Sequence, residues 1–186
     1  KPHPVGVTLG LTAWNFPIIL ISRKLAPALA AGCSMIIKPS EETPGTAVLL
    51  CKILEEAGLP KGVVNLVFGV PSEISDFLFE KNEIRKVSFT GSVPVGKLLA
   101  QKAASTLKRF TLELGGHSPA IIADDANIDN TLDILSSFKF RNAGQVCIAP
   151  SRFFIHEKIY NQIADGFIKR AKKLKLGNGL DEQTTM

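Results

Sequence analysis

Short apolar segments alternate along this chain with longer segments that carry helical spacing. Strands are expected over residues 5–13, 33–37, 63–68, 86–89, 109–114, 119–123 and 152–155. Helices are expected over residues 18–31, 43–57, 72–81, 94–106, 128–139 and 159–176. Such alternation, with few charges in the strands, is typical of right-handed βαβ units whose helices cover both faces of a parallel sheet. The predicted fold class is therefore α/β.

Several local signals place the helix boundaries. Thr43 followed by Pro44 has the pattern of an N-cap and a first-turn proline, and Ser72 with Ser75 indicates another cap region. Pro27 lies inside the first predicted helix, where we expect a kink or an adjusted turn.

Composition excludes several classes of protein. Of 186 residues, 45% are hydrophobic, and 22 Lys and Arg against 17 Asp and Glu give a net charge of +5, which is ordinary for a folded soluble domain. Arg23 and Lys24 interrupt the longest apolar run, so no membrane association is expected. Three widely spaced cysteines, Cys33, Cys51 and Cys147, argue against a disulfide framework and favour a cytoplasmic location.

The positive charge has one concentrated stretch, residues 169–175, beside apolar residues with helical spacing. Such a stretch is usually the solvated face of a helix. Non-specific nucleic-acid binding is the alternative, and we predict no nucleic-acid partner.

Polar side chains follow several of the predicted strands. They are Asn15, Lys38, Ser92, Glu113 and Cys147. Open parallel sheets bind ligands at the carboxyl ends of their strands, so the chemistry of this chain is expected at these positions. The turn at Gly91-Ser92 could bind a phosphate at the start of the next helix, although it lacks the G-x-G-x-x-G spacing and could be an ordinary turn.

The cysteines differ in their surroundings. Cys33 and Cys51 lie among apolar residues, which indicates packing, whereas Cys147 lies among Asn142, Gly144, Gln145 and Pro150. By itself, that context leaves Cys147 either a reactive thiol or a small structural residue.

Five motifs occur together in one order. They are Trp14-Asn15-Phe16-Pro17, Lys38-Pro39-Ser40-Glu41, Phe89-Thr90-Gly91-Ser92, Leu112-Glu113-Leu114-Gly115-Gly116 and Gly144-Gln145-Val146-Cys147. In this order and spacing the chain resembles the NAD(P)-dependent aldehyde dehydrogenase superfamily, most of all its succinate-semialdehyde dehydrogenase branch. The resemblance implies a Rossmann-like parallel sheet flanked by helices, and oxidation of an aldehyde to a carboxylic acid.

The resemblance also implies roles for three catalytic residues. Cys147 would be the nucleophile that forms a thiohemiacetal and then a thioester, and Glu113 would be the base that activates water. The side-chain amide of Asn15 and the backbone N–H of Cys147 would form the oxyanion hole. No metal site is implied.

The cofactor residues follow from the same resemblance. Lys38 and Glu41 would hold the adenosine ribose, Ser92 would meet the pyrophosphate, and Trp14 would lie near the cofactor path. The remaining residues expected at this site are Ser40, Gly91 and Leu114. Because a carboxylate accepts hydrogen bonds from a 2′-hydroxyl but repels a 2′-phosphate, Glu41 favours NAD, with NADP also possible.

Arg23 and Arg141 match two arginines that bind the distal carboxylate of the substrate in the succinate-semialdehyde branch. Guanidinium groups suit planar carboxylates, so a carboxylated semialdehyde is the expected substrate. The alternative is that either arginine is a surface or interface residue.

The superfamily's subunits are more than twice as long as this chain. We expect residues 1–114 to be a cofactor-binding domain that lacks its N-terminal side. Residues 115–186 would begin a catalytic domain that lacks its C-terminal side. The full-length protein is expected to be a homodimer or homotetramer. The alternatives are a non-catalytic NAD-binding or structural relative, and a fragment that is inactive alone.

Overall fold

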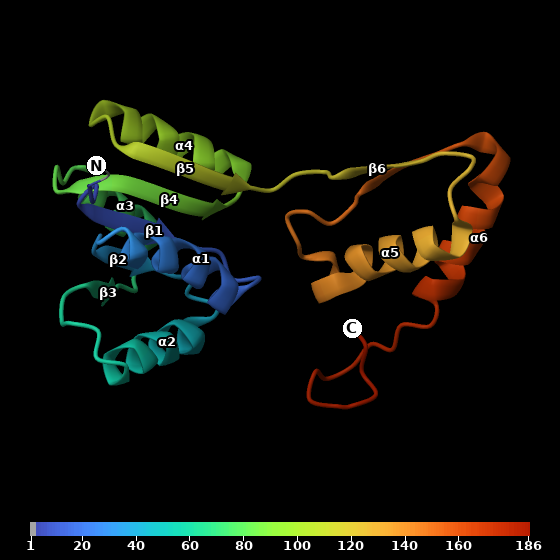
Figure 1. The fold of residues 1–186 in the computed structure, drawn as a ribbon, viewed down its shortest axis with the longest axis horizontal. Coiled ribbons are helices and arrows are strands. Elements are labelled where there is room, and N and C mark those ends of the chain that lie inside the picture. The colour runs from blue at the N-terminus through green and yellow to red at the C-terminus, as the bar shows by residue number, and fades with distance from the viewer. Residues whose placement is uncertain (1–2) are drawn as a thin grey trace. The chain divides into compact units, whose positions relative to one another are not determined.

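The computed structural model describes residues 3–186, and the chain divides into two compact units. Unit 1 spans Lys1–Leu114 and unit 2 spans Gly115–Met186 (Figure 1). Each unit builds a hydrophobic core of its own.

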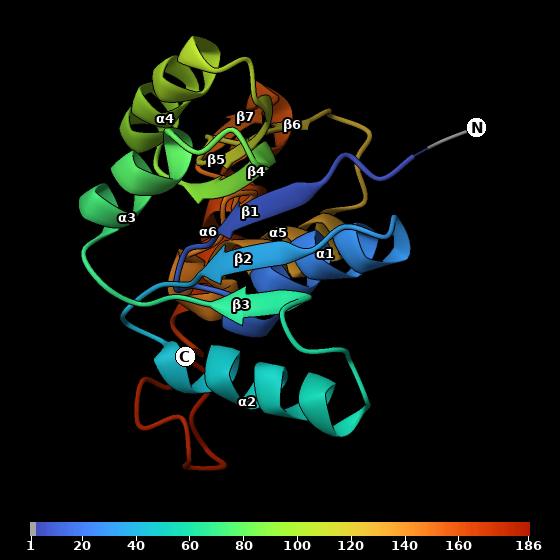
Figure 2. The same cartoon turned by 90° about the vertical axis from the view of Figure 1, so that its left-hand side faces the viewer.

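Unit 1 contains a five-stranded sheet with the order β3-β2-β1-β4-β5. Its strands are β1 (Val7–Leu11), β2 (Met35–Lys38), β3 (Val64–Leu66), β4 (Ile84–Gly91) and β5 (Arg109–Leu114). Every pairing is parallel, and Figure 2 shows the strands side by side with their arrowheads in one direction. The order reverses between β1 and β4, which is where open sheets of this kind bind ligands. The predicted α/β class and flanked parallel sheet are confirmed.

Four helices pack on the two faces of this sheet. They are α1 (Pro17–Ala30), α2 (Pro44–Glu56), α3 (Pro71–Phe79) and α4 (Val93–Ser105). Buried residues of α1 and α2 pack with Met35 and Ile37 of β2. Residues of α3 and α4 pack with Leu9, Leu11 and Val87 in a second cluster. The sheet is therefore wound on both sides.

Strands β4 and β5 alternate between apolar and polar residues. Ser88 pairs with Thr111 and Thr90 with Glu113, so these four side chains share one face of the sheet. Thr111 and Glu113 are exposed. Strand β5 is therefore an edge strand of the sheet with one polar face.

Unit 2 is smaller and contains a parallel pair of strands, β6 (Pro119–Ile122) and β7 (Arg152–Ile155). Helices α5 (Ile128–Phe140) and α6 (Tyr160–Ala171) bury Leu132 and Ile163 against this pair. The helices approach closely at Gly166, where an added Cβ would lie 2.3 Å from Leu132 Cδ1. Two short 3-10 turns, η1 (Arg141–Gly144) and η2 (Glu157–Ile159), complete the unit.

The two predicted helix starts have different outcomes. Thr43 and Pro44 occupy the N-cap and the first turn of α2 as predicted, although Thr43 makes no side-chain cap bond. Helix α3 begins at Pro71 with Val70 as its N-cap, so the cap region predicted at Ser72 and Ser75 is wrong. Ser75 instead donates to the carbonyl oxygen of Ser72 within α3. Propensity alone could not decide these caps, because the orientation of each hydroxyl depends on the preceding loop.

Helix α6 also differs from expectation. Helix α1 contains Pro27 within its bounds, whereas α6 ends at Ala171 and leaves most of the basic stretch beyond the helix. Arg170 pairs with Asp133 of α5 at 2.7 Å, so part of the stretch has a structural role in unit 2.

Within residues 3–186, the structure contains no helix that combines the length and the apolarity needed to cross a membrane.

Candidate functional site

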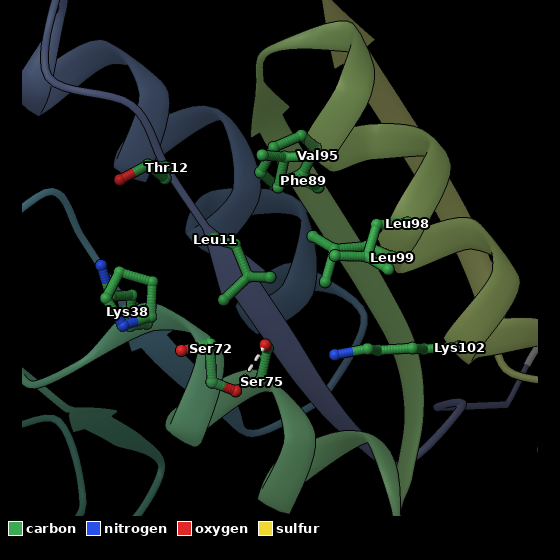
Figure 3. A pocket seen from close by; sticks show the side chains of 11 residues that line it. Leu11, Thr12, Lys38, Ser72, Ser75, Phe89, Val95, Leu98, Leu99 and Lys102 are labelled. Atoms are coloured by element: carbon green, nitrogen blue, oxygen red, sulfur yellow. Dashed lines mark hydrogen bonds between the residues drawn. The ribbon is translucent and has the colours of Figure 1, made fainter.

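A pocket of about 410 Å³ opens at the carboxyl ends of the strands in unit 1. Leu11, Thr12, Lys38 and Phe89 come from the strand ends, while α3 and α4 supply the opposite walls (Figure 3). The α3 and α4 residues are Pro71, Ser72, Ser75, Val95, Leu98, Leu99 and Lys102. The pocket is a mainly apolar slot with polar groups at its edges, on the face of the sheet covered by α3 and α4.

Thr12 lines this slot with a buried hydroxyl. Its Oγ1 has no hydrogen-bond partner among the described residues. Its backbone N–H donates to the carbonyl oxygen of Lys38 at 3.2 Å, which joins the ends of β1 and β2. A buried hydroxyl without a partner is costly, so this position suits a ligand that supplies a polar group.

Lys38 is the last residue of β2, and only 7% of its surface is exposed. Its ammonium donates to the carboxylate of Glu41, whose side chain is 45% exposed. That hydrogen bond lowers the pKa of the Glu41 carboxyl below its ordinary value. Glu41 therefore stays ionised at neutral pH next to Lys38. Ser40 is buried between these two residues and accepts from the Glu42 N–H at 3.3 Å.

The end of β4 turns directly into α4. Ser92 is the N-cap of α4, and its Oγ accepts from the Val95 N–H at 3.5 Å. A Cβ added at Gly91 would lie 2.4 Å from Cζ of Phe89, so only glycine fits beside that ring. This turn presents the positive end of the α4 dipole next to the slot.

The other residues predicted to lie near the cofactor do not line the slot. Trp14 and Asn15 lie in the loop between β1 and α1, where Trp14 is 45% exposed and Asn15 is half-buried. Leu114 is the last residue of β5, and it packs against the cluster under α4.

Glu113 precedes Leu114 and is exposed on the polar face of β5. The nearby buried group on this face is Lys24 of α1, which is 8% exposed. Lys24 Nζ donates to Ser88 Oγ at 3.0 Å and to Thr90 Oγ1 at 2.8 Å. Burial lowers the pKa of Lys24 to about 8, against the opposing attraction of the Glu113 carboxylate. Glu113 thus has a neighbouring amine that titrates close to neutral pH.

Arg23 lines a second cavity of about 350 Å³, on the face of the sheet that α1 covers. Lys24, Lys86 and Thr111 also line this cavity, so its charge is positive. The structure therefore separates Arg23 from the slot that contains Lys38, since the two lie on opposite faces of the sheet.

In unit 2, the segment before Cys147 has an unusual backbone. Asn142, Ala143 and Gly144 have φ values of 49°, 54° and 77°. Left-handed conformations of non-glycine residues are strained and tend to cluster at functional sites. Cys147 follows this turn with an exposed side chain, while Cys33 is buried and Cys51 is half-buried. Arg141 begins the turn and is exposed.

Sequence reasoning missed two residues of these sites, Thr12 and Lys24. Thr12 precedes a recognised motif, but a threonine between apolar residues gives no signal of an unpaired hydroxyl. In the sequence analysis, Lys24 was considered only as a charge that interrupts an apolar run. The available signal was its place on the apolar side of a predicted helix, because a buried ammonium needs hydrogen-bond partners inside the protein.

Comparisons with known proteins agree with this architecture. The chain matches the aldehyde dehydrogenase family over residues 1–186. It is 47% identical over 183 residues to the mitochondrial succinate-semialdehyde dehydrogenase of Oryza sativa subsp. japonica, covering 98% of this chain and 35% of that protein. It is 48% identical to 4-(hydroxymethyl)benzenesulfonate dehydrogenase TsaD1 of Comamonas testosteroni, covering 98% and 38%.

A solved structure gives the same result. A point mutant of betaine aldehyde dehydrogenase from Staphylococcus aureus, in complex with NAD+, superposes with a TM-score of 0.94 at 44% identity. The match covers 98% of this chain and 37% of that one. The chain thus spans less than two fifths of the length of each of these relatives. The match along the whole chain shows that this protein belongs to the aldehyde dehydrogenase family.

Proposed function

We propose that this chain is part of an NAD(P)-dependent aldehyde dehydrogenase that oxidises a carboxylated semialdehyde to a dicarboxylic acid. The observation that carries the proposal is the slot at the switch point of the unit 1 sheet, with a buried unpaired hydroxyl and the Lys38–Glu41 pair beside the α4 N-terminus. Family membership and identity to a succinate-semialdehyde dehydrogenase support it. We assign cofactor binding to residues 1–114 and the start of the catalytic domain to residues 115–186.

The slot fits the adenosine half of a nicotinamide adenine dinucleotide. Leu11, Phe89 and Leu99 offer apolar contacts for the adenine ring, and the Thr12 hydroxyl offers a donor to the ligand. Lys38 and Glu41 would bind the ribose hydroxyls, and Ser92 with the α4 N-terminus would bind the pyrophosphate. When bound, the nicotinamide would accept a hydride from the substrate.

The remaining chemistry belongs to side chains of this protein. Cys147 would attack the aldehyde carbon to form a thiohemiacetal, and loss of a hydride from that carbon leaves a thioester. The Asn15 amide and the Cys147 N–H would stabilise the oxyanion. Glu113 would take a proton from the water that hydrolyses the thioester, which releases the acid and restores the thiol. Lys24 would hold its proton at Nζ near Glu113, where the ammonium and the carboxylate attract each other.

The substrate class rests on two cations. Arg23 would approach the distal carboxylate from unit 1, supported by the positive cavity that it shares with Lys24 and Lys86. Arg141 would approach it from the turn before Cys147. We further propose that Glu41 makes NAD the preferred cofactor, that the complete protein is a homodimer or homotetramer, and that it acts in the cytoplasm.

The decisive test uses the native protein and measures NADH formation from succinate semialdehyde. Cys147→Ala should abolish turnover while leaving NAD binding intact, because the cofactor slot lies in unit 1. Cys51→Ala is the matched control and should keep turnover. Turnover in Cys147→Ala would refute the role of Cys147. NAD binding without turnover in the unaltered protein would instead favour a non-catalytic relative.

A further inference from the structure

Two segments of unit 2 lie side by side next to Cys147. The carbonyl oxygen of His117 accepts hydrogen bonds from the Ser151 N–H at 3.2 Å and from the Ser151 hydroxyl. Ser151 Oγ also lies 3.3 Å from Nδ1 of His117. One residue earlier, an added Cβ on Gly116 would be 3.8 Å from the carbonyl oxygen of Cys147. Residues 116–117 therefore run along residues 147–151.

The hydrogen bonds of Ser151 favour one tautomer of the His117 ring. The Ser151 hydroxyl uses its single hydrogen to donate to the His117 carbonyl oxygen, so its oxygen is left as an acceptor towards the ring. The tautomer of His117 that carries its hydrogen on Nδ1 complements this arrangement, because Nδ1 then donates to Ser151 Oγ. Ring and hydroxyl thus form a closed pair in which each residue both donates and accepts.

Strained backbone occurs close in the chain to both of these segments. Ser118, directly after His117, has a φ of 34° although it precedes a proline, and Asn142 and Ala143 are left-handed before Cys147. Such conformations persist where surrounding contacts hold them in place. The His117–Ser151 pair supplies contacts of this kind at the amino ends of β6 and β7.

We propose that His117 and Ser151 are positioning residues for the Cys147 thiol. They would act through the backbone of residues 147–151, by holding that segment against residues 116–118, and would not touch the substrate. The Ala149 N–H donates to the Val146 carbonyl oxygen at 3.0 Å, so the nucleophile sits in a turn that the pair fixes from its carboxyl side. The inference rests on the proposed function, because that function makes Cys147 the nucleophile.

His156 provides the matched control in the same unit. It follows β7 at the end opposite Ser151, and its N–H donates to the Ile122 carbonyl oxygen at 3.0 Å. Its Nδ1 accepts from the Lys158 N–H at 3.3 Å, so its ring has a capping role on η2. Replacing either histidine removes one exposed imidazole, but only His117 adjoins the Cys147 segment.

The experiment compares His117→Phe, Ser151→Ala, His117→Asn and His156→Phe in the native protein. A small displacement of a nucleophile costs rate more than binding, so we expect kcat to fall by about tenfold or more in His117→Phe and Ser151→Ala. The KM for NAD should be unchanged, because the slot in unit 1 has no part in the pair. His117→Asn keeps a side-chain N–H donor and should recover most of kcat, and His156→Phe should retain it.

A second measurement is independent of turnover. Hydrogen exchange of the Ala149 and Ser151 amides should be faster in His117→Phe and Ser151→Ala, and close to normal in His117→Asn and His156→Phe. Should Ser151→Ala fail to fold, His117→Phe still tests the pair, since it removes only the ring donor and leaves both bonds to the His117 carbonyl oxygen.

Three results would overturn the inference. They are unchanged exchange and kcat in His117→Phe, an equal loss of kcat in His156→Phe, and a loss of kcat that His117→Asn does not reverse. A native protein without aldehyde turnover would refute the proposed function and, with it, the role in catalysis. The exchange data would then show whether the pair itself holds the segment.

Discussion

The buried ammonium of Lys38 donates a hydrogen bond to the carboxylate of Glu41, three residues further along the chain. This bond keeps the Glu41 carboxyl ionised by lowering its pKa. A fixed negative charge therefore stands beside the buried positive charge of Lys38, which lines the slot. The Glu41 carboxylate can accept a hydrogen bond from a ribose 2′-hydroxyl but repels a 2′-phosphate.

Glu41→Gln should change cofactor preference. Without the carboxylate, the repulsion of a 2′-phosphate is lost and Lys38 becomes available to it, so the ratio of kcat/KM for NADP to that for NAD should rise by at least about tenfold. Steady-state kinetics with both cofactors measure the ratio. The adjacent exposed Glu42 is the control, because Glu42→Gln leaves the Lys38 pair intact. An equal rise in Glu42→Gln would show that net charge, and not the pair, sets the preference.

Arg23→Ala and Arg141→Ala should weaken recognition of a distal carboxylate. We expect kcat/KM for succinate semialdehyde to fall by an amount equivalent to about 2 kcal/mol in each variant, while a neutral aldehyde of similar length is little affected. The comparison needs both substrates at one ionic strength. Arg109→Ala, at the exposed start of β5, is the control. Equal losses on both aldehydes would mean that neither arginine binds the carboxylate.

Gly91→Ala should damage both stability and cofactor binding. The new methyl group would collide with the buried Phe89 ring, with 2.4 Å to its Cζ, and this ring lines the slot. Overpacking of this kind costs about 1–3 kcal/mol in the free energy of unfolding. Denaturant titration and NAD binding measure the two effects. Gly45→Ala is the control, since an added Cβ there meets nothing within 4 Å. Unaltered NAD binding in Gly91→Ala would exclude Phe89 as part of the cofactor slot.

Lys24→Met should change how stability depends on pH. Burial lowers the pKa of Lys24 from 10.5 to about 8, so between these values the unfolded chain binds more protons than the folded one. The contribution of Lys24 to stability therefore rises with pH across this window, and the cost of burying its charge is fully present below pH 8. Lys24→Met abolishes that rise. The difference in melting temperature between Lys24→Met and the unaltered protein should therefore not be the same at pH 7 as at pH 10.

The control for this prediction is Lys97→Met, which replaces an exposed lysine of α4. Its effect on the melting temperature should be the same at both pH values. A pH-independent difference in Lys24→Met would show that Lys24 contributes through packing and its bonds to Ser88 and Thr90, without a shifted titration.

The spacing of apolar residues predicted the strands and helices well where that spacing was regular. The strand over Arg109–Leu114 and the start of α5 at Ile128 follow directly from the spacing of their side chains. Prediction failed at Val70 and Ala171, where a helix cap or end depends on the loop beside it. The motifs placed Lys38, Glu41 and Ser92 at strand ends because each lies within a few residues of its strand in the chain.

The sequence alone determined the alternation of strands and helices, the positions of the polar strand ends and the resemblance that identified the family, since all of these depend on short-range order. Tertiary structure decided which of those ends face one another. It brought Ser72 and Lys102 to the slot beside Lys38, buried Lys24 against Ser88 and Thr90, and paired His117 with Ser151. These contacts join residues far apart in the chain, and their energies depend on burial and on hydrogen-bond geometry that exist only once the sheet and its helices have packed.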